Sequence, residues 1–151
     1  MRRMPHAPDF TALINGMVRG WDKAMGLVFT SVSPDEVVAE VDVAEHHLQP
    51  YGIVHGGVHC GLVEAACSTG AAVYSMQHGQ TVVGLENSTS FLRAARAGKL
   101  RVRAVPLQRG RRAHVWEAVV SDAAGNALAS GRVRLICLEP DAALAGKKVE
   151  V

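Results

Sequence analysis

Residues 58–77 read VHCGLVEAACSTGAAVYSMQ, and this stretch decides the fold. It consists mainly of Ala, Val, Leu, Gly, Cys and Ser, and between His46 and Leu85 the one formally charged side chain is Glu64. We interpret the stretch, from about Val58 to Gln77, as a helix. Because a helix without a solvated polar face must be surrounded by protein, the rest of the chain has to wrap around it.

The flanking sequence supplies extended segments for that wrapper. Apolar spacing from Asp9 to about Arg19 predicts a short opening helix, and the turn residues 33–35 separate two valine-rich runs that predict a hairpin. Two strands, one apolar helix and four strands predict an α+β fold, an antiparallel sheet curled around a central helix. The six predicted strands are Gly26–Ser31, Glu36–Val43, Thr81–Leu92, Leu100–Leu107, Ala113–Ser121 and Ala127–Leu138.

Length and composition indicate one domain over residues 1–151, with a core at about 20–139 and a tail at about 141–151 that has little to pack and is a candidate for disorder. Sixteen basic and fourteen acidic side chains leave a formal charge of +2, which does not favour a nucleic-acid partner. No run approaches the roughly 20 apolar residues of a membrane span, and no signal-peptide core follows the start, so we expect a cytoplasmic protein. Three cysteines without a CxxC pair predict no disulfide framework.

Glu64 is the first candidate for chemistry, because a carboxylate among Leu62, Val63, Ala65 and Ala66 is costly unless it is partnered. Gly56 and Gly57 lie just before the predicted helix, where free N–H groups and the helix dipole favour an oxyanion. Gln49 offers a side-chain amide, and Ser68 falls on the same helix face as Glu64. Each signal also has a structural explanation: a buried Glu held by backbone amides, glycines that only form a turn, a solvated Gln, or a Ser bonded to its own helix.

Together these residues resemble a known pattern. Gln49-Pro50-Tyr51-Gly52-Ile53-Val54-His55-Gly56-Gly57, followed by Glu64 and Ser68, is similar to the Gln…His-Gly-Gly…Glu…Ser/Thr pattern of hotdog-fold acyl-CoA thioesterases. The most similar branch is the PaaI-like, 4-hydroxybenzoyl-CoA thioesterase type, with bacterial relatives that act on 1,4-dihydroxy-2-naphthoyl-CoA or on mischarged enterobactin carrier protein. The resemblance runs from about Met25 to Leu138 and implies a hotdog fold and an acyl-CoA, or acyl-pantetheine, thioesterase without a cofactor.

The resemblance also implies roles. Glu64 is the nucleophile or the general base, the Gly56 amide with Gln49 polarises the thioester carbonyl, and His55 shapes the turn. Ser68 positions the water or the carboxylate. Phe91 stands where relatives of the naphthoyl-CoA type carry a His, which indicates a more apolar acyl pocket. The expected substrate and CoA contacts, with arginines for the phosphates, are Gly57, Val82, Val83, Gly84, Phe91, Arg93, Arg109 and Arg111, and Arg112 is a further candidate.

Spacing adds a consequence for assembly. Gly56 and Glu64 are eight residues apart along the helix, about 12 Å, too far for both to touch one thioester carbon. We therefore expect an obligate homodimer in which Gln49, His55 and Gly56 of one chain face Glu64 and Ser68 of the other. The exposed sheet face of this fold favours a homotetramer.

Other chemistries stay open at this point. His55, His59 and Glu64 could suggest a metal site, but they lack the one-face spacing of an HExxH motif, so we expect no metal. Cys60 and Cys67 lack an evident cationic neighbour that would favour a nucleophilic thiolate. A hotdog dehydratase pairing His55 with Glu64, or a non-catalytic acyl-CoA-binding protein, is the alternative from a different class. The residues do not specify the acyl group.

Overall fold

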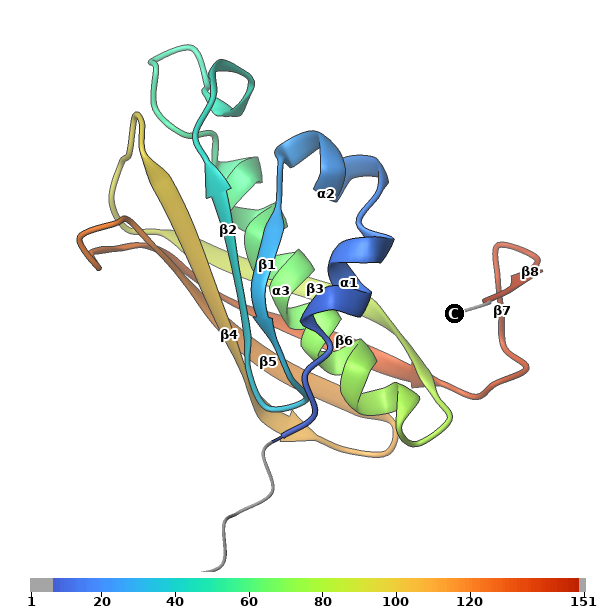
Figure 1. Ribbon diagram of the computed structural model, residues 1–151. Helices are drawn as coiled ribbons and strands as arrows, with labels where there is room; N and C mark the ends of the chain where they lie inside the picture. The colour runs from blue at the N-terminus through green and yellow to red at the C-terminus, as the bar shows by residue number, and fades with distance from the viewer. Residues whose placement is uncertain (1–6, 150–151) are drawn as a thin grey trace, which may run out of the picture.

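A computed structural model describes residues 7–149 of the chain. A six-stranded antiparallel sheet with strand order β1-β2-β4-β5-β6-β3 curls around one long helix, α3 (Figure 1). This arrangement confirms the predicted α+β hotdog architecture. The strands are β1 (Val28–Val32), β2 (Val37–Asp42), β3 (Thr81–Phe91), β4 (Lys99–Arg109), β5 (Ala113–Ser121) and β6 (Ala127–Leu138).

The central helix α3 spans Gly56–Met76. It begins at Gly56 rather than at Val58 because His55 acts as its N-cap: His55 Nδ1 accepts the Gly57 N–H at 2.8 Å. The expectation that Gly56 and Gly57 precede the helix is therefore wrong, and the two glycines form its first turn.

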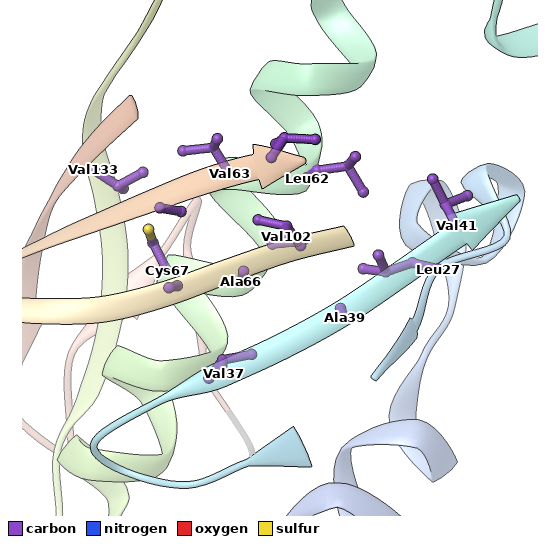
Figure 2. Packing of buried hydrophobic residues seen from close by; sticks show 14 of the residues in the cluster. Leu27, Val37, Ala39, Val41, Leu62, Val63, Ala66, Cys67, Val102 and Val133 are labelled. Carbon is purple, nitrogen blue, oxygen red and sulfur yellow. The ribbon is translucent and has the colours of Figure 1, made fainter. Parts of the chain in front are cut away.

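The core lies between α3 and the concave face of the sheet (Figure 2). Leu62, Val63, Ala66 and Cys67 of α3 are fully buried. Gly70 lets Trp116 of β5 approach the helix, because the Trp116 ring occupies the place that a Cβ at position 70 would take. Burying each valine or leucine contributes roughly 1.5–3 kcal/mol, so the sheet holds α3 firmly. The strand residues shown around the helix include Val37, Ala39, Val41, Val102 and Val133.

Two short helices, α1 (Thr11–Met17) and α2 (Gly20–Met25), replace the single opening helix predicted over Asp9–Arg19. The chain breaks between them because Arg19 is extended and Gly20 has a φ of +58°. The Asn15 side chain bonds both the N–H and the carbonyl of Phe29, at 3.0 and 2.8 Å. These bonds anchor the helices along the edge strand β1.

The remaining elements are small. A 3₁₀ turn, η1 (Glu45–His47), precedes the Gln49 loop, and the tail contains a short hairpin of β7 (Ala143–Leu144) and β8 (Lys147–Lys148). Residues 150–151 of the predicted tail lie outside the described residues. All three cysteines are free; Cys67 is buried in the core, and Cys60 and Cys137 are partly buried. Among the described residues, no helix is both long and apolar enough to cross a membrane.

Candidate active site

Glu64 sits at the middle of α3 with its side chain half-buried and both carboxylate oxygens engaged. The Ser68 hydroxyl donates to Oε1 at 3.0 Å, one helical turn further along. The Asn87 amide of β3 donates to Oε2, also at 3.0 Å. Two donors, one on each oxygen, limit the rotation of the carboxylate. Sequence reasoning had identified Ser68 but not Asn87.

An irregularity in β3 brings Asn87 to the helix. The pairing of β3 with β6 passes from Gly84 opposite Leu135 to Glu86 opposite Arg134, which leaves Leu85 as an extra residue. Such a bulge shifts the alternation of side chains by one position. Gly84 and Asn87 therefore both face Glu64, whereas Glu86 points to the other face and pairs with Arg134 at 2.6 Å.

Gly84 makes room for the carboxylate. A Cβ at this position would lie 2.6 Å from Glu64 Oε1, closer than side-chain carbons are found. Glycine is therefore required for close approach of the carboxylate to β3. The expected substrate contact at Gly84 thus borders Glu64 directly, and its neighbour Val83 is half-buried in the same strand.

Glu64 and Ser68 open into a mainly apolar pocket of about 420 Å³ between α3, β3 and the N-terminal helices. Trp21 of α2 lies over Gly61 of α3, in the place that a side chain there would occupy. Burial raises the pKa of Asp22, which also lines the pocket. The other lining residues are Ile14, Ala65, Thr69, Ala72 and Val82. This arrangement suits an acyl group held beside the carboxylate.

The start of α3 offers a free backbone donor. The Gly57 N–H donates to His55 Nδ1 and the Val58 N–H to the His55 carbonyl, at 2.8 and 2.9 Å. The Gly56 N–H has no acceptor among the described residues. An unpaired amide at a helix N-terminus is suited to a developing oxyanion. His55 supports this turn as a cap, and Gly57 has its own amide occupied.

A second pocket, of about 330 Å³, lies at this helix start. The Phe91 ring covers Gly56 so closely that a Cβ there would lie 2.7 Å from Cζ. Gln49 Oε1 accepts a hydrogen bond from the Tyr51 N–H. The Gln49 Nε2 group has no acceptor among the described residues. The lining residues are Gln49, Ile53, Val54, Gly56, His59, Phe91, Leu92, Arg93 and Ala94.

The two halves of the predicted site are thus in separate pockets of one chain. Glu64 and Ser68 line the pocket under the N-terminal helices, whereas Gln49, Gly56 and Arg93 line the pocket at the helix start. Along α3, Gly56 and Glu64 are about 12 Å apart. A single chain does not bring the carboxylate and the oxyanion donor onto one carbonyl.

Arg109 and Arg111 lie at the far end of α3, with Tyr74 and His78. Arg109 is occupied there: its Nη1 donates to the Pro34 carbonyl at 2.7 Å and to Asp35 at 2.8 Å, and its guanidinium stacks 4.4 Å from the Tyr74 ring centroid. Tyr74 follows Glu64 by ten residues, about 15 Å of helix. Arg109 and Arg111 therefore lie away from the pocket at the start of α3 that Arg93 lines.

The rival chemistries find little support in the geometry. Within residues 7–149, no group of three His, Cys, Asp or Glu side chains is arranged to hold a metal. Burial, with the charge of Glu64 as a smaller cause, raises the pKa of the Cys67 thiol, the opposite of what a nucleophilic thiolate needs. His55 is committed to its helix cap rather than to a pair with Glu64.

Comparison with known proteins identifies the family of this chain. A model of the thioesterase superfamily matches residues 51–129. Protein Rv1847 of Mycobacterium tuberculosis is 39% identical over 138 residues, 90% of this chain and 98% of that protein. Its solved structure superposes with a TM-score of 0.78 over 79% of this chain and 96% of the other. The proofreading thioesterase EntH of Cronobacter sakazakii is 35% identical over 109 residues, 72% of this chain and 79% of EntH.

Proposed function

This chain belongs to the thioesterase superfamily and is a thioester hydrolase, and from that premise we propose that it cleaves acyl-CoA thioesters with Glu64 as the catalytic carboxylate. The observation that carries the proposal is the doubly held Glu64, with Ser68 and Asn87 each 3.0 Å from one oxygen, beside an apolar pocket. A positioned carboxylate next to a bound acyl group is the arrangement that attack on a thioester requires.

The chemistry follows from these groups. A carboxylate accepts about four hydrogen bonds, so Glu64 keeps lone pairs free after bonding Ser68 and Asn87. It either removes a proton from a water that attacks the carbonyl carbon or attacks that carbon itself, and water then releases the acid. In both routes the carbonyl oxygen becomes negative, and the C=O bond forms again as the C–S bond breaks. The sulfur leaves as the thiol after it takes a proton, from Glu64 in the first route and from solvent water in the second. The Gly56 N–H is the proposed donor to that oxygen.

We also propose that the working unit is a homodimer with shared sites. The carboxylate pocket of one chain needs the free Gly56 amide, with Gln49 and Arg93 beside it, from the other. Edge strand β3 supports this pairing, because it leaves backbone groups unpaired and carries exposed Leu85. Further association through the outer sheet face, where Val119 and Ile136 are exposed, would give a tetramer.

The test of the reaction is thiol release from a panel of benzoyl-, hydroxyphenylacetyl-, short- and medium-chain acyl-CoAs, followed with a thiol reagent. An acyl-pantetheine assayed in parallel shows whether the nucleotide part of CoA contributes to turnover. We expect turnover that Glu64→Gln, an isosteric change, reduces by about 1,000-fold or more. Full activity in Glu64→Gln would refute the mechanism.

Complementation tests the shared site. Gln49→Ala and Glu64→Gln protomers are each impaired, but a heterodimer holds one site with both native residues. Random exchange makes about half of the dimers heterodimers, so about a quarter of all sites should recover. No recovery after proven exchange of subunits would place both residues in one chain's site.

A further inference from the structure

Two polar side chains of β3 form a hydrogen-bonded series that ends on the carboxylate of Glu64. The Thr89 hydroxyl donates to Asn87 Oδ1 at 2.6 Å. Asn87 Nδ2 then donates to Glu64 Oε2 and to the Cys60 carbonyl, each at 3.0 Å. The Asn87 amide thereby ties the carboxylate to a fixed point of the α3 backbone, one turn before it.

The chemistry of its neighbours fixes which way the Asn87 amide points. The Cys60 carbonyl and an ionised Glu64 only accept hydrogen bonds, so the amide must present its NH₂ group to them. Its oxygen then faces Thr89, whose hydroxyl can donate. The reverse orientation would place three acceptor oxygens together, at the cost of both bonds to α3.

The bulge at Leu85 is what makes this contact possible. Without the extra residue, strict alternation from Val82 and Gly84 would turn Glu86 toward α3. A second carboxylate would then face Glu64, and the two like charges would repel each other. With the bulge, a neutral donor faces Glu64 instead. The strand therefore selects a donor over an acid at this point.

We propose that Asn87 is a positioning residue of the hydrolysis, acting through Glu64. It holds the carboxylate in one orientation, and Thr89 holds Asn87. The inference rests on the proposed role of Glu64. Asn87 touches the carboxylate and the helix backbone rather than the acyl pocket, whose lining residues do not include it.

The experiment measures kcat and KM of the full-length protein on the acyl-CoA that the wild type hydrolyses fastest. Loss of one bond to a charged group predicts that Asn87→Ala lowers kcat about 10- to 100-fold while KM changes less than about 3-fold. Thr89→Val should show the same change on a smaller scale, about 3- to 10-fold in kcat.

Two further variants separate positioning from a structural effect. Isosteric Asn87→Asp should be slower at neutral pH than Asn87→Ala, because it adds a charge beside Glu64. Ser88→Ala, on the same strand with its side chain on the opposite face, should keep kcat within about 2-fold. Circular dichroism and Tm confirm that each variant is folded.

The outcomes are distinct. If Glu64→Gln is inactive but folded Asn87→Ala keeps the kcat of the wild type, the positioning role is wrong and the proposed function stands. If the wild type hydrolyses no thioester, the proposed function itself has failed. An Asn87→Asp variant as active as the wild type would also overturn the inference.

Discussion

Replacing Gly84 with alanine tests whether the position of the Glu64 carboxylate sets the rate. The added Cβ would lie 2.6 Å from Glu64 Oε1, whereas Cβ atoms in proteins essentially never approach another heavy atom more closely than 3.0 Å. The carboxylate has to move by roughly 0.5 Å, and since a shift of about 1 Å can cost 100-fold, we expect kcat to fall about 10-fold. The same oxygen accepts the Ser68 bond, which the movement disturbs.

The backbone itself should tolerate the change. Gly84 is not among the glycines with positive φ, so alanine fits its conformation without strain. Tm should therefore change little while kcat falls. Gly16→Ala is the matched control, because a Cβ at that helical position meets nothing within 4 Å. It should leave kcat unchanged.

A shorter acid makes the reasoning refutable. Glu64→Asp withdraws the carboxylate by about 1.5 Å, one carbon–carbon bond, and removes the clash. In that slower background, Gly84→Ala should change kcat by less than about 2-fold, a strong departure from additivity. Thiol release from one acyl-CoA measures all four proteins. If Gly84→Ala lowered kcat equally in the wild-type and Glu64→Asp backgrounds, or in neither, Gly84 would not act by making room for the carboxylate.

Three further outcomes are expected. Arg93→Ala should raise KM for an acyl-CoA several-fold and leave Tm unchanged. Arg109→Ala should leave KM unchanged but lower the free energy of unfolding by about 1 kcal/mol, because Arg109 contacts the β1–β2 turn and Tyr74. Equal changes in KM for the two variants would contradict this division of roles. Burial lowers the pKa of His59, so stability is full above about pH 6.5 and falls as pH drops toward the lowered pKa. The fall in Tm between pH 7.5 and 5.5 should be smaller in His59→Phe than in the wild type. An identical fall in both proteins would contradict this role of His59. Trp21→Ala, which uncovers Gly61 at the acyl pocket, should increase kcat/KM for bulkier acyl groups relative to short ones in the acyl-CoA panel.

The central helix and its carboxylate were predictable because they depend on composition alone. A segment of about 20 residues rich in Ala, Leu and Cys, with one formal charge, favours a buried helix, and that one charge stands out. The antiparallel wrapper followed from alternation and turn residues, and β3 to β6 lie close to their predicted ranges. The N-terminal break was missed because it depends on the positive φ of Gly20, which an apolar repeat does not reveal.

Asn87 could not be predicted from period-two reasoning. Alternation from Val82 and Gly84 places Glu86 toward the helix, and the bulge that reverses this is set by the register against β6. The signal in the sequence is weak: a glycine inside a strand pattern, which suggests a bulge or a close approach, and here accompanies both. Likewise, the use of Arg109 became visible only when residues 34–35 and Tyr74 were placed beside it.

The position of β3 connects catalysis to assembly. This strand carries Gly84, Asn87 and Thr89, which position Glu64 within one chain, and it is also a free edge of the sheet. A monomer therefore has an ordered Glu64, while the Gly56 amide that should oppose it lies in another pocket. On the proposed mechanism, dilution below the dimer dissociation constant should abolish turnover although the Glu64 network stays intact. Activity that is independent of concentration down to a proven monomer would contradict that mechanism, because one chain holds the two groups too far apart to act on one carbonyl.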